Sequence, residues 1–98
     1  SVAMTYDKCL EPATISHFDL GAVTYGLVLA AWSKGLGTVI NGQGIMQSAV
    51  VREHAQIPDD QIIMICIAMG YPNDDFAAND VVSRRASNDD FVRYVGFD

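Results

Sequence analysis

The stretch from Ser16 to Gly44, SHFDLGAVTYGLVLAAWSKGLGTVINGQG, decides the fold of this chain. It contains a helix start, an apolar helical run, a glycine stop, a short β-favouring segment and a glycine-rich turn. Ser16 followed by Asp19 matches a capping-box pattern, so we expect the helix to begin at Ser16. Gly35 is expected to take the left-handed conformation that often follows a helix. The other elements are expected to bury this helix and to present the turn.

The helical run from Gly21 to Trp32 is apolar on nearly every face. A helix without a polar face is buried either in a protein core or in a membrane. Because a membrane span needs about 20 residues, the run is too short to cross a bilayer. It therefore predicts a buried core helix and a chain without membrane association.

The flanking segments add three strands, a second helix and a tail. The predicted strands are Val2–Asp7, Thr38–Ile40 and Gln61–Met69, the second helix is Ile45–Ala55, and a short helical turn starts at Ser87. Residues 73–82 read as an acidic surface loop, and the apolar tail Phe91–Phe97 needs something to pack on. This order predicts one domain over residues 1–98 with mixed α/β or α+β layers, which include a mixed sheet, a buried helix and a C-terminal arm.

Charge and cysteine content exclude several classes of function. The formal net charge is −6 with only six Lys and Arg residues, and phosphate contacts to nucleic acid require clustered basic side chains. Cys9 and Cys66 show neither a metal-binding spacing nor a disulfide framework. We therefore expect no nucleic-acid partner and no metal site, and a reducing cytoplasm as the location.

Two groups of residues are candidates for ligand binding. The first is the turn Asn41, Gly42, Gln43 and Gly44, where glycine lets a ligand approach the main chain and a following helix offers free N–H groups. The alternative is a tight turn that simply requires glycine. The second is the adjacent pair Arg84 and Arg85, which suits a phosphate or carboxylate. The alternative for Arg84 and Arg85 is a solvated pair whose charge balances that of the nearby aspartates.

An ordered series of segments resembles the C-terminal half of the nitroreductase family. The series is DLGAVTYGLVLAAWSKGLGT, NGQG, VVREHAQIPDDQIIMICIAMGYP and SRRASNDDFVRYVGF. Members of that family have an acid-led buried helix with a Gly-Leu-Gly turn, a short helix with an Arg-Glu pair, and an apolar strand that ends in Gly-Tyr-Pro. An arginine-containing tail follows.

The resemblance implies FMN as cofactor, NAD(P)H as electron donor, and reduction of nitroaromatics, quinones or similar small-molecule acceptors. It implies a homodimeric α+β sandwich whose C-terminal arm reaches the partner subunit. The turn Asn41–Gly44 would then lie against the flavin ring, and Arg85 or Arg84 would contact the FMN phosphate. No residue of this chain is expected to be catalytic, since hydride chemistry belongs to the flavin.

The first half of the family, with its phosphate clamp, has no counterpart in these residues. A fragment, a short gene product and one part of an assembly all fit that observation, and we expect the isolated chain to be inactive. The rival interpretation is a flavin-free half-domain that acts as a self-associating structural module.

Overall fold

The computed structural model describes residues 1–97, and Asp98 lies outside the described residues. Three strands, β1 (Val2–Asp7), β2 (Gly37–Asn41) and β3 (Gln61–Gly70), form one sheet in the order β1-β3-β2. The predicted α+β class is confirmed. The prediction of a mixed sheet is wrong, because the sheet contains no parallel pair among the described strands. β3 lies between β1 and β2 and runs antiparallel to both.

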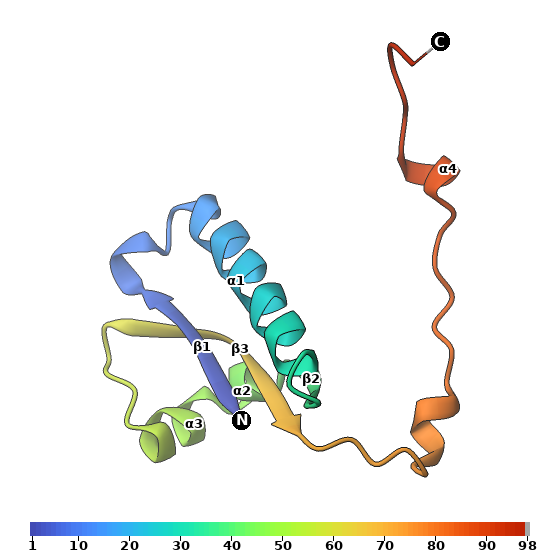
Figure 1. Ribbon diagram of the computed structural model, residues 1–98. Coiled ribbons are helices and arrows are strands. Elements are labelled where there is room, and N and C mark those ends of the chain that lie inside the picture. Colours follow the sequence, from blue (N-terminus) through green and yellow to red (C-terminus); the bar gives the residue numbers. More distant parts are fainter. Residues whose placement is uncertain (98) are drawn as a thin grey trace.

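Helix α1 (Thr14–Trp32) packs on one face of the sheet, and two short helices lie on the other (Figure 1). The pairing explains the two faces, because side chains alternate along a strand. Ile67 pairs with Val2 and Ile40, whereas the adjacent Cys66 pairs with Ala3 and Asn41. Ile67 and Cys66 are both buried, so the central strand is covered on its two sides, as its continuous apolar sequence predicts.

The start of α1 differs from the prediction. The helix begins at Thr14, and Ala13 is its N-cap without a side-chain hydrogen bond. Ser16 is a buried residue inside the first turn, and its hydroxyl donates to the carbonyl oxygens of Ala13 (2.6 Å) and Leu10 (3.2 Å). Because its hydroxyl donates to these two carbonyls, Ser16 connects the first turn of α1 to the preceding chain and does not cap the helix.

The end of α1 agrees with the prediction. Gly35 has φ +76°, the left-handed conformation that glycine adopts at low cost. The Leu36 N–H donates to the Ala31 carbonyl, which satisfies a carbonyl of the last helical turn. The chain thereby reverses into β2 over the surface of the sheet.

The predicted complete burial of α1 is wrong. Only Ser16, Thr24 and Ala31 are buried, on the side that faces the sheet. The opposite side exposes large apolar residues, among them Phe18 at 72% and Trp32 at 68%. The physical reason is that the sheet covers one side of the helix and no described element covers the other. No helix in residues 1–97 is long and apolar enough to cross a membrane.

The single helix predicted after the turn is two helices, α2 (Gln43–Met46) and α3 (Ser48–Ala55). The break falls at Gln47, whose φ and ψ of −123° and 41° are not helical. No glycine or proline stands at this position, so the sequence carries no signal for it. α3 ends at Gln56, which has φ +53°.

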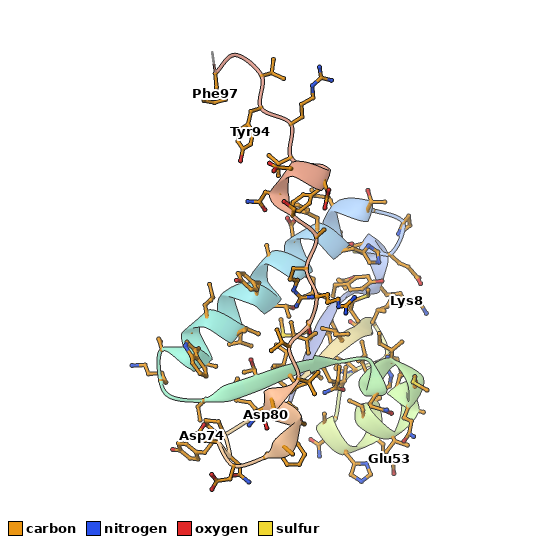
Figure 2. The ribbon with its side chains drawn as sticks, turned by 90° about the vertical axis from the view of Figure 1, so that its right-hand side faces the viewer. Lys8, Glu53, Asp74, Asp80, Tyr94 and Phe97 are labelled. Atoms are coloured by element: carbon orange, nitrogen blue, oxygen red, sulfur yellow. The ribbon has the colours of Figure 1, made fainter. Side chains whose placement is uncertain are left out.

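The chain after β3 leaves the body of the protein (Figure 1). It holds a 3₁₀ turn at Ala77–Asp80 and the short helix α4 (Asn88–Phe91). Ser87 caps α4 in a capping box with Asp90, which confirms the predicted helical turn. We call residues 81–97 the arm. Figure 2 shows Tyr94 and Phe97 at its far end, beyond the end of α1.

Candidate functional site

The turn Asn41–Gly44 connects the last residue of β2 to the first turn of α2. Asn41 pairs with Cys66 across the sheet, so the turn folds onto the face that carries Cys66. The Asn41 side-chain oxygen accepts a hydrogen bond from the Gln43 N–H at 3.3 Å. This local bond is an Asx turn, and it sets the direction in which the helix starts.

The two glycines of this turn have different environments. A Cβ atom on Gly42 would meet nothing within 4 Å. A Cβ atom on Gly44 would clash with the Cys66 Sγ and lie 3.2 Å from the Cys66 Cβ. Gly44 is buried. Close packing between α2 and β3 therefore explains Gly44, whereas Gly42 leaves open space beside the main chain.

A cavity of about 410 Å³ lies beside the turn. Asn41, Gln43 and Gly44 line it from the turn, and Cys66 lines it from the sheet. Two further polar side chains line it, that of Gln47 between α2 and α3 and that of His54 in α3. These two residues are absent from the sequence-based candidates, because the sequence predicts a continuous helix over residues 45–55. The break at Gln47 is what places α2 and α3 on two sides of one cavity.

One ring nitrogen of His54 forms a hydrogen bond to the main chain. Its Nδ1 lies 3.0 Å from the Val50 carbonyl oxygen, the geometry of an Nδ1–H donor. Nε2 then carries the acceptor lone pair in the neutral ring. The cavity thus offers amide donors and acceptors with one imidazole, and its lining contains no carboxylate and no Lys or Arg side chain.

Arg84 and Arg85 lie on the arm, in the segment between the 3₁₀ turn and α4. Both are exposed, and within residues 1–97 neither side chain forms a hydrogen bond or an ion pair. Neither lines the cavity beside the turn. The structure of one chain therefore brings together Asn41, Gln43 and Gly44 but does not bring the arginine pair to them. In the described part of the chain, no cluster of His, Cys, Asp and Glu could hold a metal ion.

Cys9 is the exposed thiol of the chain, and its neighbour Asp7 controls its ionisation. A side-chain hydrogen bond to Asp7 raises the pKa of the Cys9 thiol and lowers the pKa of the Asp7 carboxyl. The Cys9 backbone N–H also donates to Asp7 at 2.9 Å. Since the thiolate is the nucleophile, a raised thiol pKa disfavours the reactive form of Cys9.

We expect Asp7→Ala to speed alkylation of Cys9 by iodoacetamide at pH 8. Removing the carboxylate lets the thiol pKa fall, so a larger fraction is thiolate at that pH. The rates of the two proteins should converge at a pH above both thiol pKa values. Cys9→Ser, which leaves only the buried Cys66, is the control and should show no fast labelling. Equal rates at pH 8 would contradict the role of Asp7.

Comparison with known proteins identifies relatives of this chain. The family model described as the nitroreductase family matches residues 2–71. A protein of Comamonas testosteroni named chloronitrobenzene nitroreductase is 30% identical over 91 residues. A protein of Ectopseudomonas oleovorans named nitrobenzene nitroreductase is 28% identical over 91 residues. Each alignment covers 93% of this chain and 39% of the relative, so the chain spans about two fifths of their length.

Proposed function

Since this chain belongs to the nitroreductase family, we propose that it forms part of an FMN-dependent oxidoreductase. The proposed reaction is reduction of nitroaromatics, quinones or similar acceptors with NAD(P)H as electron donor. The observation that carries the proposal is the family match over residues 2–71, which includes both the turn and the central strand. Two relatives whose names refer to nitrobenzenes favour nitroaromatic compounds as acceptors.

The residues around the turn fit the ring end of a flavin. Gly42 leaves space beside the main chain, and the adjacent cavity of about 410 Å³ presents the side-chain amides of Asn41, Gln43 and Gln47. A flavin ring has carbonyl and N–H groups along one edge, and amides can pair with both kinds of group. Apolar residues such as Val50 and Val51 provide the rest of the wall.

The bound flavin supplies the hydride chemistry, and the protein positions it. In this role Asn41 and Gln43 would hold and orient the ring through hydrogen bonds to its polar edge. The Gln43 side chain stands at the start of α2, while the Asx turn fixes the backbone of Asn41. Close packing of Gly44 on Cys66 holds α2 at its distance from the sheet. Asn41 and Gln43 would thus bind and orient the ring, and neither would transfer a proton.

The phosphate end of FMN requires cationic partners, and no Lys or Arg side chain lines the cavity. Arg84 and Arg85 are suited to a phosphate by charge and by geometry, and they lie on an arm that extends away from the body (Figure 1). We assign them to the phosphate of a flavin bound by another copy of the chain. The protein is accordingly proposed to act as a homodimer in which the arm reaches the partner.

One set of observations favours a second candidate function. Large apolar side chains are exposed both on α1 and along the arm, including Val82 at 88%. Exposed apolar patches of this kind mark association surfaces. A flavin-free module that self-associates would use these surfaces without any cofactor at the turn.

Flavin binding decides between the two functions. We expect the purified chain to bind added FMN, seen as quenching of flavin fluorescence, whereas oxidation of NAD(P)H with nitrobenzene as acceptor is expected only when the family's first half is also present. Arg85→Ala should weaken FMN binding about tenfold, the loss of one charge-assisted contact. Arg93→Ala, which removes another exposed arginine of the arm, is the matched control. Absence of FMN binding would favour the flavin-free module, and unchanged affinity in Arg85→Ala would remove Arg85 from the site.

A further inference from the structure

The four asparagine residues of the chain differ in the residue that follows them. Asn41 precedes Gly42, whereas Asn73, Asn79 and Asn88 each precede an aspartate. The following residue controls how easily its main-chain nitrogen can reach the asparagine side chain, and glycine, which has no Cβ atom, hinders this approach least. Asn41 is half-buried and Gly42 is exposed, so water reaches the pair. An intramolecular reaction between the two groups is therefore sterically easiest at Asn41.

We propose that Asn41–Gly42 is a site of spontaneous modification, at which Asn41 loses its side-chain amide and becomes aspartate or isoaspartate. The Gly42 main-chain nitrogen attacks the Asn41 Cγ atom and gives up its proton to solvent. The bond between Cγ and Nδ2 breaks, and Nδ2 takes up a proton and leaves as ammonia. Water then opens the resulting succinimide ring at either of its two carbonyls. The sequence of steps consumes one water molecule and needs no oxidant, reductant or enzyme.

The Asx turn prepares the side-chain carbonyl of Asn41 for this attack. Because its Oδ1 accepts a hydrogen bond from the Gln43 N–H at 3.3 Å, the side chain folds back over the Gly42 peptide. The same N–H faces the oxygen on which negative charge develops when a nucleophile adds to Cγ. A hydrogen-bond donor at that oxygen stabilises the addition. The turn thus both positions and activates the group that is attacked.

The attacking nitrogen is not held by a hydrogen bond of its own. At the end of β1 the next N–H, that of Lys8, donates to the Asp60 carbonyl at 2.7 Å and continues the ladder. β2 has no such continuation: Asn41 and Cys66 are its last pair, and within residues 1–97 the Gly42 N–H has no hydrogen-bond acceptor. This nitrogen can therefore turn towards the Asn41 side chain without losing a hydrogen bond.

Asn73 provides an internal comparison with Asn41. Its Oδ1 accepts a hydrogen bond from the Asp75 N–H at 3.2 Å, so it forms the same kind of turn, and it is exposed. The residue that follows it is Asp74, whose side chain crowds the main-chain nitrogen. The carboxylate of Asp74 also disfavours negative charge on that nitrogen. Asn73 shares the turn with Asn41 and lacks the glycine, so we expect it to stay intact for longer.

Conversion of Asn41 changes the cavity beside the turn. An amide that donates and accepts hydrogen bonds becomes a carboxylate that only accepts them. No Lys or Arg side chain lines the cavity to balance the new charge. Isoaspartate also adds one carbon atom to the main chain at the end of β2. The modification itself does not depend on flavin binding, but its consequence rests on the proposed function: the modified chain would bind FMN more weakly.

Ageing of the purified chain at pH 8, followed by peptide mass analysis, tests the site. We expect peptides with Asn41 to gain the mass difference between an amide and an acid at least about tenfold faster than peptides with Asn73, a barrier difference of about 1.4 kcal/mol. Gly42→Ala, whose methyl would meet nothing within 4 Å, should slow the change at Asn41 and leave Asn73 unaffected. Equal rates at the two asparagines, or an unchanged rate in Gly42→Ala, would overturn the proposal.

FMN titration of Asn41→Asp tests the consequence separately. This variant carries the modified side chain from the start, and we expect its dissociation constant for FMN to be about tenfold higher than that of unaged protein. Asn73→Asp adds the same charge at a residue that does not line the cavity, and it should bind FMN as the unaltered chain does. Unchanged FMN binding in Asn41→Asp would overturn the flavin role of Asn41, whereas the ageing experiment alone decides the modification.

Discussion

Gly44→Ala is expected to lower the free energy of unfolding by about 1–3 kcal/mol, the usual range for an added group in a filled core. The new methyl on α2 would clash with the side chain of Cys66, which lies across the contact on β3. Cys66 cannot retreat easily, because it is buried in the central strand with neighbours on both sides. The cost is expected despite the better helix propensity of alanine, which alone would favour the variant by about 1 kcal/mol.

Urea unfolding followed by circular dichroism, at fixed protein concentration, measures this effect. Gly42→Ala is the matched control, since its methyl would meet nothing within 4 Å, and we expect a change within about 0.5 kcal/mol. Adding Cys66→Ala to Gly44→Ala removes the sulfur atom and should recover part of the loss in a double-mutant cycle. Equal stabilities of the two alanine variants would show that Gly44 is not required for packing.

Arg52→Ala is expected to destabilise the protein by about 1.5–3 kcal/mol, the range for hydrogen bonds that involve a charged group. The Arg52 guanidinium donates to the carbonyl oxygens of Pro58 (2.5 Å) and Gln61 (2.9 Å), with a longer contact of 3.4 Å to the Ile57 carbonyl. One side chain of α3 thereby holds the turn that leads into the central strand. The Arg-Glu pair is visible in the sequence, but only the structure shows what the arginine binds.

Thermal and urea unfolding of Arg52→Lys and Glu53→Ala complete this test. Lysine keeps the charge but lacks the planar fork that reaches several carbonyls together, so we expect only partial recovery. Glu53 is the exposed neighbour in the sequence and should tolerate alanine within about 0.5 kcal/mol. If Arg52→Ala lost no more stability than Glu53→Ala, the proposed role of the Arg52 guanidinium would be excluded.

The elements with a strong local signal could be predicted from the sequence. β1 has its predicted bounds, β3 extends one residue further, and the capping box of Ser87 is present. The errors share a physical origin in tertiary contacts. Ser16 bonds to carbonyls of the preceding chain instead of capping α1, and the break at Gln47 accompanies the packing of α2 on β3. Neither contact leaves a local mark in the sequence.

The candidate site was predictable only in part. Glycine at positions 42 and 44 predicts that the main chain comes close to another group. It does not show whether that group is a packed element of the protein or a bound ligand. The structure makes that distinction for Gly44. The partnership between the turn and the arm arginines stays a prediction, because it depends on contacts between chains. The exposed face of α1 was misjudged for a similar reason: an apolar helix must be covered, but the sequence does not say by what.

The position of β3 in the middle of the sheet has a consequence for the order in which the protein can fold during synthesis. β1 and β2 are both made before β3, yet each forms its ladder only with β3. Two strands of β-favouring sequence therefore leave the ribosome without a hydrogen-bonding neighbour in this sheet. Pairing between β1 and β3 also closes a long loop, which slows folding. The nascent chain is thus open to aggregation until its central strand emerges.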